Sequence, residues 1–414
     1  MASHVVCVSG PLPHQELVAG GTRFVAAQLF FDKTDLAVLD DPSIDDDISL
    51  QNLWKTKQRP ASNRSNCFMD STETVLRELQ CLKERTVVLD ISAKDRNITA
   101  LHVLSERLPA HIQIACCASP RPTAGDTVET VAGRIVSELL LGVTVEHPTQ
   151  EVTLKPSAIS CALRNSTSEI SPPDLFCLRA CALAQCEVHG VPLVIEFEPW
   201  SQIHSSVVKL LIESGAGISR VIMCRSVLSR ENLEYFAALL AETGTTEEDC
   251  QLCICVDSFG TTELPIAGPS YPTDEEVFQS VYQLIKKGYG NRLILSPSIR
   301  YRIDLRSYGG PGYAHVHEVC ESRLLGLLSC PGLGDSMPRG DESCESLAIP
   351  QILGKNGIDM LAWFKPPECA PVEQVLLTCS ICGSVFPPGD HFEKFNHLYC
   401  SSKCLSVHRK AGWV

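Results

Sequence analysis

The chain has 414 residues, which is enough for one large domain and a small one, or for two ordinary domains. Hydrophobic residues make up 44% and charged residues 20%, as in an ordinary globular protein, and the formal net charge is -14. This acidic balance argues against general binding to a nucleic-acid backbone, which needs clustered Lys and Arg.

The N-terminal segment MASHVVCVSGPLPHQEL has no basic region followed by a long apolar run. The chain also has no stretch of about 18 apolar residues. We therefore expect neither a secretory signal nor a membrane span. The 21 cysteines should then be mostly reduced thiols, in the cytoplasm or, as the alternative, in the nucleus.

From residue 23 to about residue 300, short apolar runs alternate with helical periods. Most of the runs are continuously apolar, as expected for parallel strands that are buried on both faces. The predicted strands are Phe24–Phe31, Thr86–Ile91, Ile112–Cys117, Ala158–Leu163, Pro192–Phe197, Arg220–Arg225, Gln251–Asp257 and Arg292–Ser296.

Helical patterns fill the intervals between these strands. The predicted helices are Thr74–Leu82, Thr99–Arg107, Thr130–Leu141, Asp174–His189, His204–Ser214, Arg230–Glu242 and Asp274–Lys287. Eight strands alternating with helices match the size and count of a (β/α)8 barrel. A doubly wound open sheet is the competing fold, but no Gly-rich dinucleotide loop follows the first strand.

The chain then changes character twice. Residues 330–347 are rich in Gly, Pro, Ser and acidic residues, which predicts a flexible surface insertion. A helical return and the linker PPECAP follow. We therefore expect a barrel over residues 1–368 and a separate small unit over residues 374–414.

The small unit has the spacing of a zinc site. Cys379 and Cys382 form a C-x2-C pair, and Cys400 and Cys404 form a C-x3-C pair further on. Two such pairs can close one tetrahedral, structural zinc site, and His408 is the main alternative ligand. The pattern resembles small treble-clef, HIT or MYND zinc fingers. We expect one structural zinc ion here.

Other segments resemble the phosphotriesterase-related family. The segment SYGGPGYAHVHEV directly follows LILSPSIRYRIDLR, as in that family's signature after the eighth strand, and the early GPLPHQEL is similar to its N-terminal turn. The runs GVPLVIEFEP, GAGISRVIMCRSVLS and VDSFG resemble its strands five to seven. The resemblance covers roughly residues 8–365. It implies a barrel with a binuclear metal site at the carboxyl ends of the strands, which activates water for hydrolysis.

This sequence departs from the implied metal site at each ligand position. In the family these positions hold a His-x-His pair, a bridging Lys or Glu, two single His residues and an Asp. Ser160 is an alternative to Cys161, because the register of that strand is open by one residue. The residues at the matching positions are Ala26, Gln28, Cys161, Glu196, Arg225 and Ser298.

We expect Glu196 and Arg225 to form a buried ion pair that fills the vacated metal cavity. The alternatives are a wet, unused pocket and a rebuilt metal site that uses Glu196, Glu198 and Asp257, although a permanent Arg charge opposes a cation there. The sequence therefore predicts a non-catalytic scaffold that works through an unidentified protein partner. The alternatives are a metal-dependent amidohydrolase for phosphotriesters, lactones or esters, with altered ligands, and a binder of a small molecule at the barrel mouth.

Overall fold

The computed structural model divides into two compact units, Met1–Phe364 and Lys365–Val414, which are described separately. The described residues are 3–36, 47–92, 96–146, 151–164, 166–244, 251–261, 270–329, 348–362, 377–382, 384–386, 392–394, 397–399 and 401–410. The insertion expected at residues 330–347 lies outside them. No helix within these ranges is long and apolar enough to cross a membrane.

The first unit is built on an eight-stranded parallel sheet in the order β14-β13-β12-β11-β10-β7-β6-β3. Each predicted strand overlaps one of these eight, so the prediction of a (β/α)8 barrel is confirmed. The strands in chain order are β3 (Arg23–Ala27), β6 (Thr86–Asp90), β7 (Ile112–Ala118), β10 (Ala158–Ala162), β11 (Leu193–Glu196), β12 (Val221–Cys224), β13 (Cys253–Phe259) and β14 (Leu293–Pro297).

The barrel closes between β14 and β3, which lie side by side. The Ala26 N–H donates to Ser296 Oγ over 3.0 Å, and the Ser296 hydroxyl donates to the Ala26 carbonyl over 2.7 Å. Ser296 is completely buried, so its hydroxyl satisfies two backbone groups that would otherwise lack partners. Between β14 and β3, a side chain therefore bonds the backbone groups that are bonded by backbone ladders between the other strands.

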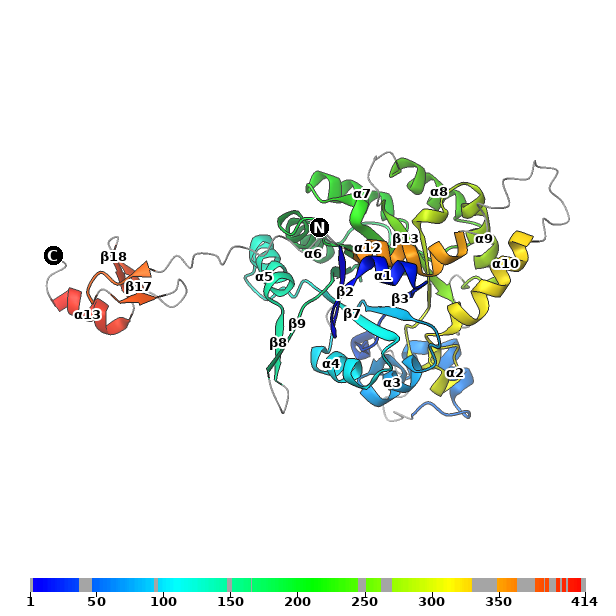
Figure 1. Cartoon of the computed structure of the whole chain (residues 1–414), viewed down its shortest axis with the longest axis horizontal. Coiled ribbons are helices and arrows are strands. Elements are labelled where there is room, and N and C mark those ends of the chain that lie inside the picture. The colour runs from blue at the N-terminus through cyan, green and yellow to red at the C-terminus, as the bar shows by residue number, and fades with distance from the viewer. Residues whose placement is uncertain are drawn as a thin grey trace. The chain divides into compact units, whose positions relative to one another are not determined.

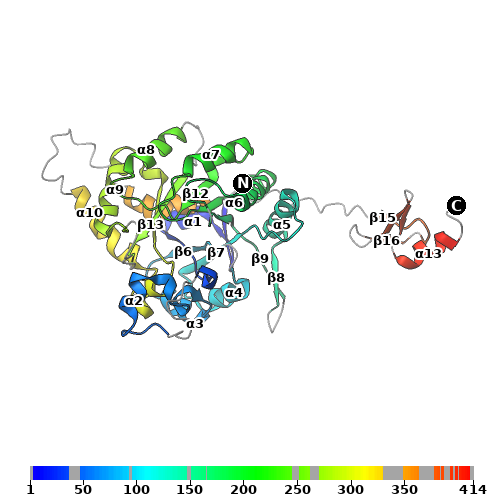
Figure 2. The ribbon, with the colours of Figure 1, turned by 180° about the vertical axis from the view of Figure 1, so that it is seen from behind.

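Helices surround the sheet, as Figure 1 and, from behind, Figure 2 show. Several begin at a residue whose side chain accepts from a backbone N–H of the first turn, among them Ser71, Asn97, Thr127 and Thr273. The seven helices that follow barrel strands in the first unit are α3 (Thr72–Leu79), α4 (Ile98–Arg107), α5 (Val128–Leu141), α6 (Pro172–Glu187), α7 (His204–Glu213), α8 (Leu233–Glu242) and α9 (Asp274–Lys286).

Shorter elements complete the first unit. After the last barrel strand come α10 (Glu321–Ser329), a π-helical turn at Gln351–Lys355 and α12 (Asn356–Leu361), and the latter two pack against β3 and β14. The smaller pieces before and between the barrel elements are β1 (His4–Cys7), β2 (Gly10–Pro13), α1 (His14–Ala19), β4 (Phe31–Asp32), α2 (Leu53–Gln58), β5 (Phe68–Met69), β8 (Val143–Glu146) and β9 (Glu151–Leu154).

In the described part of the second unit there are two small hairpins and one helix. β15 (Leu377–Thr378) pairs antiparallel with β16 (Val385–Phe386), and β17 (Phe392–Lys394) pairs antiparallel with β18 (His397–Tyr399). α13 (Ser402–Lys410) follows the second hairpin. Tyr399 is completely buried in this small unit.

Candidate functional site

Side chains alternate in direction along each barrel strand, so every second residue faces the barrel interior. Phe24 and Ala26 share an interior core with residues of the other strands. Gln28, two residues after Ala26, is the next position in this alternation. On β10 the interior positions include Ser160, whose hydroxyl donates to the Ile91 carbonyl over 3.2 Å. Cys161 instead packs in the outer core, so the structure places Ser160 rather than Cys161 in the interior.

The other positions singled out in the sequence converge at the carboxyl ends of the strands. Glu196 is the last residue of β11, Arg225 directly follows β12, and Ser298 directly follows β14. Gln28 Nε2 donates to Glu196 Oε2 over 2.9 Å, and Arg225 Nε donates to the same oxygen over 3.0 Å. The expected ion pair is therefore confirmed, with Gln28 as an additional donor.

This network lies well inside the protein. The side chain of Glu196 is only 3% exposed and that of Arg225 16% exposed. Burial of a charged pair is tolerated when hydrogen bonds offset its desolvation. Two donors converge on one carboxylate oxygen, which supplies part of this compensation.

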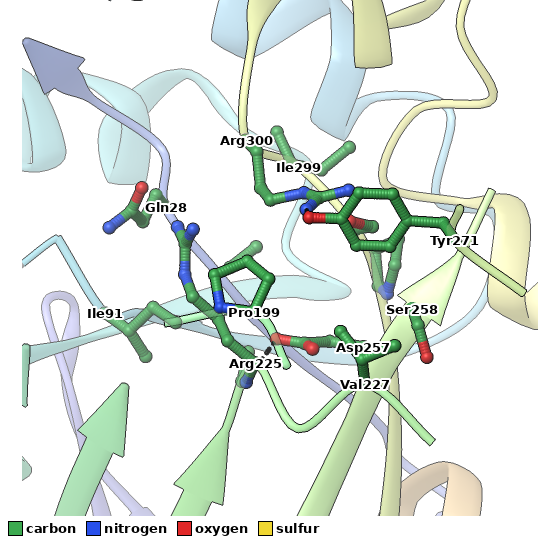
Figure 3. Close-up of a pocket in the computed structure, with 14 residues that line it drawn as sticks. Gln28, Ile91, Pro199, Arg225, Val227, Asp257, Ser258, Tyr271, Ile299 and Arg300 are labelled. Carbon is green, nitrogen blue, oxygen red and sulfur yellow. Dashed lines mark hydrogen bonds between the residues drawn. The ribbon is translucent and has the colours of Figure 1, made fainter. Parts of the chain in front are cut away.

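Arg225 adopts an unusual backbone conformation, with φ at 59°. This left-handed region is uncommon for residues other than glycine, and it persists where surrounding contacts hold it. The Arg225 N–H donates to Asp257 Oδ2 over 2.9 Å, which is one such contact. Figure 3 shows this bond, with Arg225 and Asp257 at the mouth of the barrel. Burial raises the pKa of Asp257 to about 6, although the charge of Arg225 and its N–H bond act in the opposite direction.

Two small cavities lie beside this network. The first, of about 20 Å³, is lined by Ala26, Asp257 and Ser298 among others, and it has room for about one water molecule. The second, of about 120 Å³, is lined by both members of the ion pair and by further charged side chains. Gln28, Arg225 and Arg300 border both spaces, so the two are neighbours.

Three of the charged groups that line these spaces, Lys33, Arg164 and Arg300, were not singled out in the sequence. Lys33 Nζ donates to the Arg300 carbonyl over 2.7 Å and lies 5.1 Å from the centroid of the Phe31 ring. Burial is the main cause that lowers the pKa of Lys33 well below its usual range, and nearby arginines add to it. The Arg300 guanidinium lies over the Tyr271 ring, 4.1 Å from its centroid (Figure 3). The signal in the sequence that could have indicated Lys33 and Arg300 was that they follow the first and the last barrel strand.

The second unit gathers three of its predicted zinc ligands. One ligand atom each from Cys379, Cys382 and Cys404 lies within 4.8 Å of the others. The fourth predicted ligand, Cys400, lies outside the described residues. His408 is not in this group, and its Nδ1 lies 2.7 Å from the Tyr399 hydroxyl. A cluster of thiols at this spacing fits zinc, which prefers closed tetrahedral thiolate sites for structural roles.

Comparison with known families agrees with both units. A family model described as "Phosphotriesterase family" matches residues 34–327, and one described as "Vms1-associating treble clef domain" matches residues 375–414. The chain belongs to the phosphotriesterase family. Of the finger types considered from the sequence, the treble clef is the one that this match supports.

Relatives in the phosphotriesterase family include hydrolases. The phosphotriesterase-related protein of Aedes aegypti is 26% identical over 337 residues, which is 75% of this chain and 90% of that protein. The N-acetyltaurine hydrolase of Danio rerio is 26% identical over 294 residues, 67% of this chain and 78% of that one. The crystal structure of a resiniferatoxin-binding protein from Rhodobacter sphaeroides shares the fold, with a TM-score of 0.70 and 21% identity, over 86% of this chain and 94% of that one.

The donor set of this phosphotriesterase-family barrel does not fit a pair of divalent ions. Among the described residues, the only group of three or more potential metal donors is the cysteine cluster of the second unit. At the barrel mouth the carboxylates of Glu196 and Asp257 both bond to Arg225, one to its side chain and the other to its backbone. Since a guanidinium keeps its positive charge, it repels a cation at this point.

Proposed function

We propose that this protein is a non-catalytic member of the phosphotriesterase family that acts as a scaffold through protein contacts, with a zinc finger at its C-terminal end. The observation that carries the proposal is the hydrogen-bonded network of Arg225, Glu196 and Gln28 at positions where the family places metal ligands. A fixed positive charge and an amide take the place of imidazoles there; a guanidinium repels a divalent cation, and an amide is not among the Cys, His and carboxylate ligands that bind zinc.

The finger is the proposed contact module. Its three clustered cysteines support one structural zinc ion, which a unit of this size needs in order to fold. The description of the matching domain model associates it with Vms1, so a Vms1-type protein is the first partner to test. We place the protein in the cytoplasm or nucleus, because no disulfide forms among the described cysteines, as in a reducing compartment.

Metal content tests the proposal directly. We expect one zinc per chain in the purified full-length protein and none in Cys379→Ser. The control is Cys186→Ser, which removes a half-buried barrel thiol and should leave the zinc content unchanged. Three metal ions per chain, with two retained in Cys379→Ser, would contradict the proposal.

Turnover separates the scaffold from its alternative, a hydrolase with altered ligands. That alternative has support because the relatives include enzymes named N-acetyltaurine hydrolase and a structure titled as a lactonase. We expect no hydrolysis of N-acetyltaurine, a lactone or a phosphotriester, with or without added Zn²⁺ or Mn²⁺. Turnover that Arg225→Met leaves intact but Glu196→Gln abolishes would establish the hydrolase instead.

The scaffold role is tested with a purified Vms1-type protein. We expect it to bind the full-length chain, and to bind neither Cys379→Ser nor a chain that lacks residues 370–414. The Cys186→Ser variant serves again as the matched control. Equal binding to the shortened chain would move the contact to the barrel and refute the finger as the contact module.

A further inference from the structure

The cavity of about 120 Å³ at the barrel mouth has an excess of positive charge among its described lining residues. Its cationic side chains are Lys33, Arg164, Arg225 and Arg300, whereas its carboxylates are only Glu196 and Glu198. The charges come from segments that follow different strands of the barrel. Clefts that are lined by one sign of charge and walled by protein concentrate ions of the opposite sign.

The excess remains when Lys33 is neutral. Burial is the main cause that lowers the pKa of Lys33, and the charges of Arg225, Arg164 and Arg300 lower it further. The three guanidiniums still outnumber the two carboxylates, and they cannot lose their protons. An anion in the cavity would relieve the mutual repulsion of these groups, which the Glu196 carboxylate relieves only in part.

The same cavity is bordered by two buried oxygen atoms that lack a donor. Gln28 Oε1 and Glu196 Oε1 have no hydrogen-bond partner, and the two residues are only 3% and 2% exposed. Both residues line the cavity. A buried acceptor without a partner costs free energy, and such groups mark places where a ligand or an ordered water completes the bonding.

We propose that the barrel mouth binds a small organic acid that also carries an N–H or O–H donor, such as a hydroxy acid or an amino acid. Its acid group lies among the guanidiniums of Arg164 and Arg300 and the amine of Lys33. Its donor faces Glu196 Oε1 and Gln28 Oε1. The arrangement binds and orients such a molecule without a metal ion.

Three probes of nearly equal size separate the two halves of this recognition. Lactate carries both the charge and the donor, propionate lacks the hydroxyl, and methyl lactate lacks the charge. Calorimetry on the full-length protein at pH 7 should show lactate binding about tenfold more tightly than either of the others, since buried polar groups reject analogues that leave them unpaired. Absence of lactate binding, or equal binding of all three, would overturn the inference.

Charge variants locate the site. Arg164→Gln should weaken lactate binding about tenfold, whereas Arg230→Gln, at an exposed position outside the cavity, should leave it unchanged. Arg300→Gln provides a second variant, and far-ultraviolet circular dichroism checks that each one folds. If both Arg164→Gln and Arg300→Gln bind lactate like the parent protein, the cavity is not its site. The inference goes beyond the scaffold role, because binding in the barrel needs neither the zinc nor a protein partner.

Discussion

At the scale of single residues, the barrel mouth shows how charged side chains can pair at the carboxyl ends of neighbouring strands. Gln28 and Arg225 both donate to one oxygen of the buried Glu196 carboxylate. Arg225 reaches it from a left-handed backbone that Asp257 helps to hold. Each member therefore depends on the others, and removal of one should cost more than a single contact.

Arg225→Met tests this dependence. The substitution leaves the carboxylate of Glu196, which is 3% exposed, without its charge partner, so the free energy of unfolding should fall by about 3 kcal/mol. The measurement is urea unfolding at pH 7. Arg230→Met, at an exposed position, is the control and should change the value by less than about 0.5 kcal/mol. A loss in Arg225→Met no larger than in the control would argue against a structural role for the pair.

Asp90 predicts a pH dependence of stability. Burial raises its pKa to about 6 from an ordinary 3.8, and its Oδ2 has no hydrogen-bond partner. The folded state therefore holds the carboxyl proton of Asp90 more tightly than the unfolded state does. Protonated Asp90 contributes its full share to the free energy of unfolding below about pH 4, and this share is lost as the pH rises through about 6. Asp257 has a pKa raised to the same value by burial and acts in the same direction.

The melting temperature of Asp90→Asn should consequently fall less between pH 4 and pH 7 than that of the parent protein. In the parent protein the Leu29 and Ser92 N–H groups donate to Asp90 Oδ1, and asparagine keeps an oxygen that can accept both bonds. Thermal melts at several pH values make the comparison. An unchanged pH profile in this variant would show that Asp90 does not titrate in this range.

At the scale of elements, the turn at Gln351–Lys355 and helix α12 pack against the first barrel strand, β3. Two glycines permit this contact. A Cβ on Gly354 would lie 2.1 Å from the Thr22 carbonyl oxygen, and one on Gly357 would lie 2.3 Å from the Phe24 ring. In the sequence these are only glycines in a helical segment. The structure explains why glycine is needed there, because another element approaches the backbone too closely for a Cβ atom.

Gly357→Ala should therefore destabilise the barrel by about 1–3 kcal/mol, because the completely buried Phe24 ring has to move. Gly326→Ala in α10 is the matched control, since its added Cβ would meet nothing within 4 Å. That control should stabilise the protein by about 0.5–1 kcal/mol, as alanine favours a helix over glycine. Equal effects at both positions in denaturant unfolding would contradict the packing argument.

At the scale of the whole molecule, the chain consists of two compact units with different sources of stability. The first, Met1–Phe364, has extensive apolar cores inside and outside its sheet. The second, Lys365–Val414, has short hairpins, one helix and the cysteine cluster. A unit with so small a core depends on its metal site for folding.

Removal of zinc should therefore unfold the second unit alone. With a strong chelator, we expect limited proteolysis to cut within residues 365–414 while the thermal transition of the barrel stays within about 1 °C of its original value. Cys379→Ser should show the same pattern without chelator. A large downward shift of the barrel transition would mean that the two units stabilise each other.

The sequence predicted all eight barrel strands because most of them are continuous apolar runs, a pattern that a buried parallel sheet favours. It also predicted the pairing of Glu196 with Arg225, since the resemblance placed both at neighbouring strand ends. It could not fix whether Ser160 or Cys161 faces the interior, because a buried strand is apolar on both faces and carries no alternation to set its phase.

What the sequence determined by itself was therefore the order of the elements, the family resemblance and the cysteine spacing of the finger. These features depend on local period and on spacing along the chain. Only the tertiary structure decided the cationic cavity, the additional donor Gln28, the left-handed Arg225 and the bond between His408 and Tyr399. Those features depend on tertiary contacts, most of them between segments remote in sequence, and burial is the main cause of the altered pKa values of Lys33 and Asp90.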